Sequence, residues 1–271
     1  MATTSTDFVA FKKAMKAAWM TGDFGRIASA NENRGQEFID RLRLAPGTRV
    51  LDVACGTGNQ SLPAARAGAD VTGLDIATNL LAQARERAEK EGLKIRFVEG
   101  DAEELPFSVA EFDVVLSMFG AMFAPRPERV AAEFLRVCKP SGMIAMANWS
   151  PGGFTAEMFR INSKYAPAPP DVPAPVLWGD ESVARKRFAS AARVETARRD
   201  VVFDFPFGPA EVVEMFRTYF GPTRTALSKL DPAAQKAMLE DLTRHWASRN
   251  EGDASHTIVR SEYLEVRAYP R

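Results

Sequence analysis

One short segment constrains the fold of this chain more than any other. Residues 50–59 read Val-Leu-Asp-Val-Ala-Cys-Gly-Thr-Gly-Asn, an apolar run interrupted by an acid and followed by two closely spaced glycines. The run predicts a buried strand over 49–53, and the residues after the glycines predict a helix over 60–67. Glycine lets a ligand approach the backbone closely, and a helix N-terminus supplies free N–H groups and partial positive charge. The unit therefore predicts a site for a nucleotide-like ligand.

Short apolar runs alternate with amphipathic stretches along the rest of the chain. Further strands are predicted over 71–74, 95–98, 112–117, 143–147, 194–203 and 257–268, and helices over 78–91, 129–137, 209–219 and 232–247. Continuous apolar strands joined by helical crossovers indicate a parallel sheet covered on both faces. Right-handed crossovers make such a sheet doubly wound. The prediction is an α/β protein with a mostly parallel, seven-stranded, Rossmann-like sheet.

Four parts of the chain are expected around this sheet. Residues 1–45 read as helical, including a helix over 35–44, and are expected to form an N-terminal lid. Residues 46–150 form the Rossmann-like core. Residues 151–190 are rich in proline and are expected to form a cap inserted after the fifth strand, because long segments of this kind are usually functional or disordered. Residues 191–271 are expected to complete the sheet.

Three features separate the glycine turn from other nucleotide-binding turns. The dinucleotide-binding pattern requires a third glycine, and Ser61 occupies that position here. No Gly-Lys-Ser/Thr sequence follows the turn, which argues against a P-loop. Asp52 lies just before the glycines, where its carboxylate would repel a pyrophosphate but suits a ligand that carries an ammonium and a sulfonium group. These features argue against a nicotinamide-dependent oxidoreductase.

Acidic residues also follow the next two predicted strands. Asp75 closes the second strand, at the distance from the glycine turn where a carboxylate can accept both ribose hydroxyls of an adenosine. Asp101 and Ala102 follow the third strand, where a carboxylate and a backbone N–H can bind the edge of an adenine. The fourth strand, over 112–117, and a helix and turn over 133–142 complete a series of five spaced motifs.

In this combination and order, the motifs resemble those of the class I S-adenosylmethionine (SAM)-dependent methyltransferases. The resemblance covers residues 49–149 and is strongest to the small-molecule branch that includes the ubiquinone and menaquinone biosynthesis enzymes. One departure is Ser141, where the family usually has a second glycine, and we expect it to affect that turn alone. The resemblance implies SAM as cofactor, S-adenosylhomocysteine (SAH) as product, and in-line transfer of a methyl group to a small molecule.

The resemblance also implies roles for individual residues. Asp52 would orient the methionine moiety directly or through water, Asp75 would hold the ribose, and Asp101 would bind the adenine edge. The complete set of implied cofactor-binding residues is Trp19, Asp52, Ala54, Gly56, Gly58, Asn59, Asp75, Ile76, Asp101, Ala102 and Ser117. The alternative is a SAM- or SAH-binding protein of the same fold with other chemistry or no activity.

Aromatic residues and methionines follow the fourth and fifth strands and recur in the cap. The expected acceptor-binding residues are Met118, Phe119, Met122, Phe123, Asn148, Trp149 and Trp178. A wall of this composition suits an apolar or aromatic acceptor with an O, N or C nucleophile. The chain has two histidines, and His245 and His256 are the candidate general bases. Tyr165, Glu157 and Asn148 are no better supported as bases, and the methyl acceptor and the atom methylated stay open.

Composition limits the partners. The chain has 35 Lys and Arg and 35 Asp and Glu residues, and without a basic excess a nucleic-acid partner is disfavoured. Residues 117–120 lack the Asp/Asn-Pro-Pro-aromatic motif of amino-methylating DNA enzymes and the cysteine of the RNA cytosine type. Cys55 and Cys138 are expected to be free thiols, and no metal site is predicted. Without a spanning stretch or a signal peptide, we expect a cytoplasmic monomer or homodimer with no membrane partner.

Overall fold

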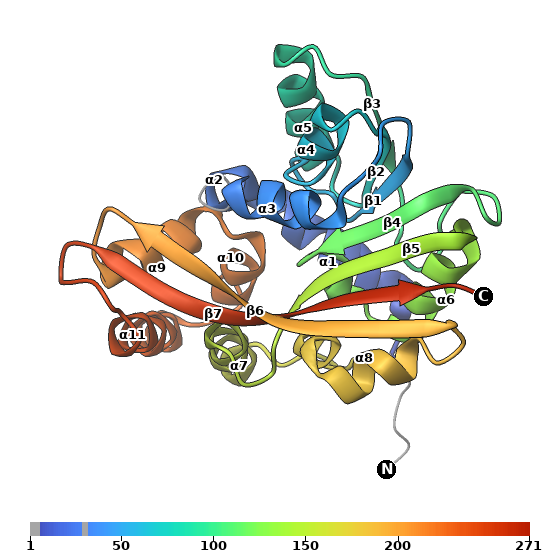
Figure 1. The fold of residues 1–271 in the computed structure, drawn as a ribbon. Coiled ribbons are helices and arrows are strands. Elements are labelled where there is room, and N and C mark those ends of the chain that lie inside the picture. Colours follow the sequence, from blue (N-terminus) through green and yellow to red (C-terminus); the bar gives the residue numbers. More distant parts are fainter. Residues whose placement is uncertain (1–5, 29–31) are drawn as a thin grey trace.

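The computed structural model describes residues 6–28 and 32–271. Its centre is one seven-stranded sheet in the order β3-β2-β1-β4-β5-β7-β6 (Figure 1). The strands are β1 (Arg49–Val53), β2 (Asp70–Asp75), β3 (Ile95–Glu99), β4 (Phe112–Met118), β5 (Cys138–Trp149), β6 (Arg193–Phe205) and β7 (Thr257–Tyr269). Strands β1 to β5 pair in parallel, whereas β7 pairs antiparallel with both β5 and β6. The predicted seven-stranded, mostly parallel sheet is confirmed.

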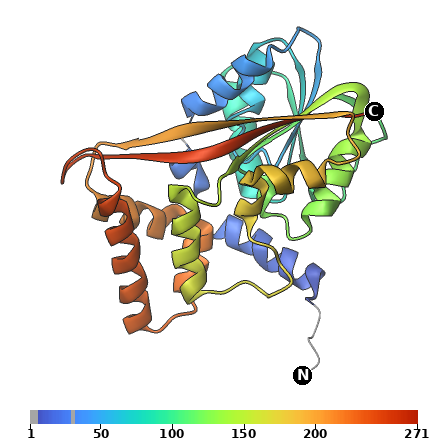
Figure 2. The same cartoon turned by 60° about the horizontal axis from the view of Figure 1, so that its bottom comes forward.

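Helices cover both faces of the parallel part of the sheet. The covering helices are α3 (Glu32–Leu42), α4 (Ser61–Arg66), α5 (Thr78–Lys90), α6 (Pro127–Val137) and α8 (Glu181–Arg187). Figures 1 and 2 show α3, α4 and α5 on one face and α6 and α8 on the other. In β1, Val50, Leu51 and Val53 have no exposed surface, because a parallel strand covered on both faces buries both sets of its side chains. This is the doubly wound arrangement that the alternating pattern predicts.

Two elements differ most from their predicted boundaries. The helix predicted over 35–44 begins earlier and ends at Leu42. Strand β5 begins at Cys138, ahead of the predicted range 143–147. Cys138 pairs with Phe112, and the register then shifts, so the polar turn residues before the apolar run lie inside an irregular strand. Apolar periodicity does not detect a strand start of this kind.

A further layer of helices lies beyond the carboxyl ends of the parallel strands. It comprises α1 (Phe8–Thr21), α2 (Phe24–Ala28), α7 (Phe154–Tyr165), α9 (Pro209–Tyr219), α10 (Gly221–Leu227) and α11 (Pro232–Ser248). Strands β6 and β7 extend out of the parallel sheet, and α9, α10 and α11 connect them (Figure 2). Helix α7 packs on α11, and α1 packs on α10. Chain segments from before the sheet, after β5 and between β6 and β7 thus share one layer. Helices α2, α7, α8 and α10 were not predicted as helices.

Short 3-10 helices, η2 (Ala121–Phe123) and η3 (Pro175–Gly179), complete the described elements.

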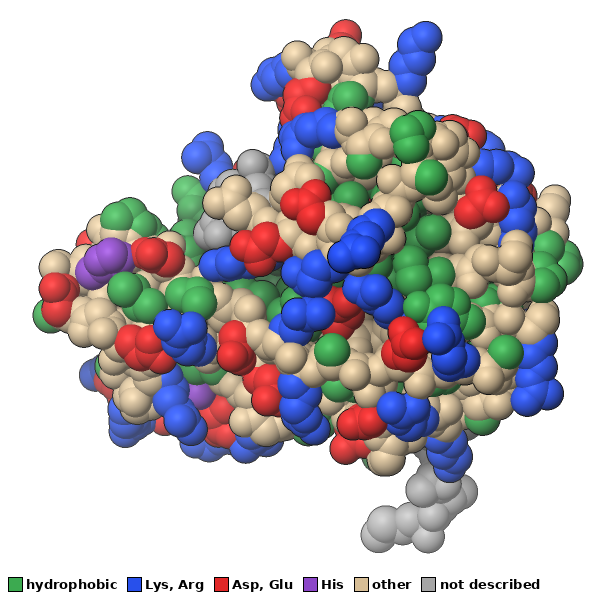
Figure 3. Space-filling view, viewed as in Figure 1, with side chains coloured by type: hydrophobic (Ala, Val, Ile, Leu, Met, Phe, Trp, Pro, Cys, Tyr) green, Lys and Arg blue, Asp and Glu red, His purple; other side chains and the backbone are tan. Residues whose placement is uncertain are grey.

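A buried carboxylate, Glu265 of β7, accepts hydrogen bonds at 2.8–2.9 Å from Arg41, Arg199 and Arg267, and so joins α3, β6 and β7. Over the face drawn in Figure 3, acidic and basic side chains are interspersed. None of the described helices is both long enough and apolar enough to cross a bilayer.

Candidate functional site

A cavity lies where the carboxyl ends of the parallel strands meet the helical layer. The segments after β1, β2, β3 and β4 form one side of it, and β5, β6 and the helical layer contribute the rest. Doubly wound sheets bind their ligands at this edge, where the strand order reverses. The predicted site residues that line the cavity are Trp19, Ala54, Gly56, Asn59, Asp75, Ile76, Asp101, Ala102, Met118, Phe119, Phe123 and Trp149.

The turn after β1 presents its backbone to this cavity. Ala54 and Gly56 have positive φ angles of 56° and 54°, in the left-handed region that glycine adopts readily and alanine rarely. A side chain on Gly120 would meet the Ala54 carbonyl oxygen at 2.5 Å, so the loop after β4 can approach the turn only because residue 120 is glycine. Gly58 closes the turn by donating its N–H to the Cys55 carbonyl (2.9 Å) and does not line the cavity.

Asp75 ends β2, and its carboxylate lies in the cavity wall. One carboxylate oxygen accepts the Gly56 N–H and the other accepts the Ala77 N–H, both at 2.8 Å. Burial raises the pKa of Asp75, and the two N–H groups oppose that shift because they stabilise the charged form. Each carboxylate oxygen can accept a second hydrogen bond. Asp75 can therefore still bind hydroxyl groups that enter the cavity.

Asp52, near the end of β1, has no exposed surface and lies outside the cavity wall. Its Oδ2 accepts the Ser61 hydroxyl (2.6 Å), while its Oδ1 has no hydrogen-bond partner within the described structure. Burial raises the pKa of Asp52 to about 7; the Ser61 bond lowers it, and the nearby Asp75 carboxylate raises it further. Of the two predicted ways in which Asp52 could orient the methionine moiety, this position favours the one through water, because the side chain lies behind the cavity wall.

The acids near the turn fit a cationic ligand. Asp52 lies behind the wall and Asp75 within it, and no lysine or arginine is among the described lining residues. A buried carboxylate without compensation is costly, and the unpartnered Oδ1 of Asp52 shows that the protein does not compensate it fully. The ammonium and sulfonium groups of SAM would supply positive charge at this place.

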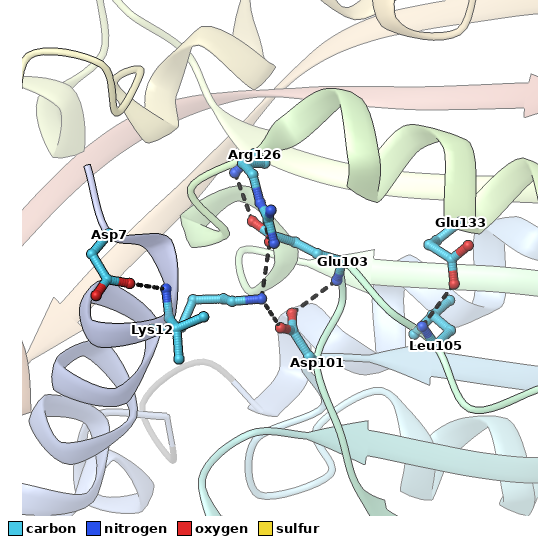
Figure 4. A network of polar contacts seen from close by, with 8 residues as sticks. Asp7, Lys12, Asp101, Glu103, Leu105, Arg126 and Glu133 are labelled. Atoms are coloured by element: carbon cyan, nitrogen blue, oxygen red, sulfur yellow. Dashed lines mark hydrogen bonds and ion pairs between the residues drawn. The ribbon is translucent and has the colours of Figure 1, made fainter. Parts of the chain in front are cut away.

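The loop after β3 places Asp101 in the cavity wall and connects it to α1 (Figure 4). Lys12 of α1 donates to Asp101 and lies 3.2 Å from a carboxylate oxygen of Glu103. Glu103 has a fully buried side chain, binds Arg126 at 2.6 Å, and donates its backbone N–H to Asp101 at 2.9 Å. Other residues of α1 line the cavity, so this ion-pair network fixes α1 across the end of the cavity next to β3.

Aromatic rings line the other half of the cavity. Phe119 stacks on Trp149 with 3.7 Å between the ring centroids, and Trp19 meets Phe123 edge-on at 5.3 Å. The rings in the described wall are Trp19, Phe24, Phe119, Phe123, Trp149, Phe154, Phe159, Phe203, Phe216, Phe220 and Trp246. Asp75 and Asp101 are the charged residues among the described lining residues, and both follow strands on the far side of β1. The ring-lined half therefore offers an apolar surface without charge.

Residues 50–142 match the family model of a methyltransferase domain. The chain is 39% identical over 211 residues to the uncharacterized protein Rv1403c of Mycobacterium tuberculosis, which is 77% of each protein. It is 42% identical over 112 residues to a demethylmenaquinone methyltransferase of Renibacterium salmoninarum, which is 41% of this chain and 46% of that protein. This chain belongs to the class I SAM-dependent methyltransferases. SAM is accordingly the cofactor of this methyltransferase.

Solved structures share the fold of the methyltransferase. The YcgJ protein of Bacillus subtilis has a TM-score of 0.61 at 16% sequence identity, over 88% of this chain and 99% of that chain. The phosphoethanolamine N-methyltransferase 2 of Haemonchus contortus, solved with phosphomonomethylethanolamine and SAH, has a TM-score of 0.56 at 21% identity, over 88% of this chain and 53% of that chain. At these identities the likeness shows the fold.

Four further residues expected at the site do not line the cavity of the methyltransferase: Ser117, Met122, Asn148 and Trp178. Ser117 and Asn148 precede the lining residues Met118 and Trp149, and successive side chains of a strand point to opposite faces. The Ser117 hydroxyl accepts the Ala121 N–H at 3.0 Å instead. Met122 is buried in η2, between two lining residues. Trp178 is buried, with the Arg187 guanidinium 4.4 Å from its ring centroid.

Neither histidine is placed to act as a general base in this cavity. The His245 ring stacks on the Phe154 ring with 4.3 Å between the centroids, and its Nε2 lies 3.0 Å from the Phe154 carbonyl oxygen. Burial lowers the pKa of His245, so the ring is neutral at pH 7. His256 follows α11 and pairs with Asp204 of β6 at 2.6 Å, away from the cavity wall. Neither predicted base lines the described cavity, and both rings make other contacts.

The wall also contains residues that were not predicted as site residues. Among them are Met15, Phe24, Ile27, Ala28, Phe203, Phe216, Phe220 and Trp246, together with Thr155, Met158 and Phe159 of α7. Helices over 209–219 and 232–247 were predicted, but periodicity shows only that a helix has an apolar face and not what that face covers. Their aromatic residues are Phe216, Tyr219 and Trp246, about the same share as the 10% of the whole chain, so composition gives no signal either.

Proposed function

We propose that this methyltransferase transfers the methyl group of SAM to a small, neutral, apolar or aromatic acceptor. The observation that carries the proposal is the ring-lined half of the cavity, in which no described side chain is charged. Burying a charged group without a partner is strongly unfavourable. The Haemonchus contortus enzyme was solved with a phosphate-containing compound, whereas the described wall here has no lysine or arginine to pair with a phosphate.

In this proposal the chain holds the cofactor by its strand ends. Asp75 accepts the ribose hydroxyls, Asp101 and Ala102 bind the adenine edge, and the backbone at Ala54 and Gly56 receives the methionine moiety. These roles are supported by the two unused acceptor positions of Asp75 and by the exposure of the turn backbone to the cavity. When bound, SAM supplies a methyl group on a positively charged sulfur.

In this proposal the ring-lined half of the cavity positions the methyl acceptor and excludes water. No histidine, lysine or acid from the described chain lines that half, so the chain offers no side-chain base there. Holding two reactants in line can lower a barrier by about 7–11 kcal/mol without such a base. Rings that pack edge-on and face-on around the acceptor provide this positioning, because they are large and have few rotatable bonds.

The test has two stages. Calorimetric titration with SAM and with SAH should give micromolar dissociation constants, and NAD should not bind. Transfer of a labelled methyl group from SAM is then measured with a panel of neutral phenols, quinols, thiols and aromatic amines, with phosphoethanolamine as the charged control. Turnover confined to phosphoethanolamine would contradict the proposal. Binding of SAH without methylation of any panel member would favour a protein that uses the same fold for other chemistry.

A further inference from the structure

The helical layer contributes one hydroxyl group to the described wall of the ring-lined half. Thr155 lies in the first turn of α7, lines the cavity, and is 3% exposed. Its neighbours along the helix, Phe154 and Met158, line the cavity as well. A polar atom therefore interrupts an otherwise apolar surface, and such an atom is costly to bury unless it has a hydrogen-bond partner.

Thr155 forms a pair with Ser261 of β7. The two hydroxyl oxygens lie 2.7 Å apart, and the Ser261 oxygen also accepts the backbone N–H of Thr155 at 3.2 Å. Ser261 has no exposed surface. The pair fixes the start of α7 to β7 and holds the Thr155 hydroxyl in one orientation.

The number of hydrogens in this pair leaves one without an acceptor. Each hydroxyl has one hydrogen to donate. If Thr155 donated to Ser261, the Ser261 hydrogen would need another acceptor, and none is present among the described residues. If Ser261 donated to Thr155, the Thr155 hydrogen would likewise have no acceptor within the described structure, so the distance allows either donor. Thr155 lines the cavity and Ser261 does not, so a ligand there can complete the pair in the arrangement in which Ser261 donates to Thr155.

We infer that Thr155, oriented by Ser261, is a specificity-determining residue that donates a hydrogen bond to an oxygen atom of the methyl acceptor. The substrate class is then a neutral aromatic molecule that carries a hydroxyl or carbonyl oxygen. Trp19, Trp149 and Trp246 also line the cavity and carry indole N–H donors, whereas the Thr155 hydroxyl is held in place by a hydrogen bond to the buried Ser261. The inference rests on the proposed function, because it names the substrate class of the same site.

The experiment compares two probes that differ by one oxygen atom. Dissociation constants of 2-naphthol and naphthalene are measured by equilibrium dialysis in saturating SAH, for the wild type, Thr155→Val and Thr155→Ser. Valine keeps the shape of threonine but removes the hydroxyl, and serine keeps the hydroxyl. In Thr155→Val the affinity for 2-naphthol, relative to naphthalene, should fall about two- to tenfold, the value of one neutral hydrogen bond. Thr155→Ser should retain the wild-type ratio.

Each outcome decides a different claim. An unchanged ratio in Thr155→Val with normal SAH affinity overturns the role of Thr155 but leaves the aromatic acceptor site intact. Failure of both probes to bind the SAH-saturated wild type overturns the proposed function and this inference together. Should Thr155→Val lose SAH binding, Thr155→Ala, which puts no γ-methyl group in the place of the hydroxyl, gives the same comparison.

Discussion

Replacing Asp75 by asparagine tests the proposed cofactor site at a residue that makes two hydrogen bonds within the protein and is proposed to bind the ribose. The carboxylate accepts the Gly56 N–H on one oxygen and the Ala77 N–H on the other, both at 2.8 Å. In Asp75→Asn one of those oxygens becomes an NH2 group, so a donor faces a donor whichever way the amide turns. The variant also removes the negative charge that we propose binds the ribose hydroxyls.

The two consequences have separate magnitudes. A buried N–H that loses its acceptor costs about 1–3 kcal/mol of unfolding free energy. Loss of one hydrogen bond between a ribose hydroxyl and a charged carboxylate costs about 1.5–3 kcal/mol of binding free energy, which raises the dissociation constant of SAH about 10- to 150-fold. The variant should therefore remain folded, with a lower melting temperature, and bind SAH weakly.

Calorimetry with SAH and with its 2′-deoxy analogue separates the ribose contact from general damage. The wild type should prefer SAH, and Asp75→Asn should bind the two ligands with similar affinity. Asp113→Asn is the matched control, because Asp113 is also a strand aspartate that accepts a backbone N–H (Arg49, 2.9 Å) but lies outside the cavity wall. If folded Asp75→Asn binds SAH as tightly as the wild type, the assigned ribose contact is wrong.

Three further perturbations follow from single contacts. Lys12→Met removes the ion pairs that fix α1 and should raise the rate of SAH dissociation several-fold, as measured by stopped-flow displacement. Lys13 is exposed, and Lys13→Met should leave that rate unchanged. Equal dissociation rates in Lys12→Met and the wild type would show that α1 does not cover the cofactor. Burial raises the pKa of Asp52 from 3.8 to about 7, so the stability from its bound proton is complete below pH 4 and is lost as the pH rises to 7. The unfolding free energy of the wild type relative to Asp52→Asn should thus fall by on the order of 4 kcal/mol across that range in urea titrations, and a flat difference would contradict the shift. Glu265→Gln weakens contacts to three partly exposed arginines and should cost about 2–3 kcal/mol in urea denaturation, whereas exposed Glu262→Gln should cost below about 1 kcal/mol; similar losses would refute the importance of burial.

The parallel sheet and the residues at its edge could be predicted from the sequence because the patterns that indicate them are local. Each strand is a short apolar run, and Asp75 and Asp101 stand at or just after the ends of such runs. The carboxyl ends of parallel strands meet at one edge, so strand order alone brings these acids together. The glycines were predictable for the same reason, since Gly56 has the left-handed φ that the turn requires.

The ring-lined half of the cavity was harder to predict from the sequence because residues far apart in the chain meet there. Phe203, Phe216 and Trp246 come from β6, α9 and α11 and reach the same cavity as Trp19 of α1. Their apolar periodicity predicts an amphipathic element in each case, but not its partner. Asn148 and Trp178 were misplaced for a related reason, because a residue near a strand end or in a proline-rich segment can face either side of the sheet.

Ser61 shows how a local departure from a pattern carries structural information that the pattern alone does not. In the sequence this residue argues against dinucleotide binding, because glycine is required there for close helix packing. In the structure its hydroxyl donates to Asp52 at 2.6 Å, inside a region with no exposed surface. A buried acid near the turn and a hydroxyl at the start of α4 are thus one arrangement, since the hydroxyl donates to one oxygen of the acid. Glycine at 61 would remove this hydroxyl and leave Asp52 the backbone N–H of residue 61, so the serine that departs from the dinucleotide pattern is the residue that stabilises the buried acid behind the turn.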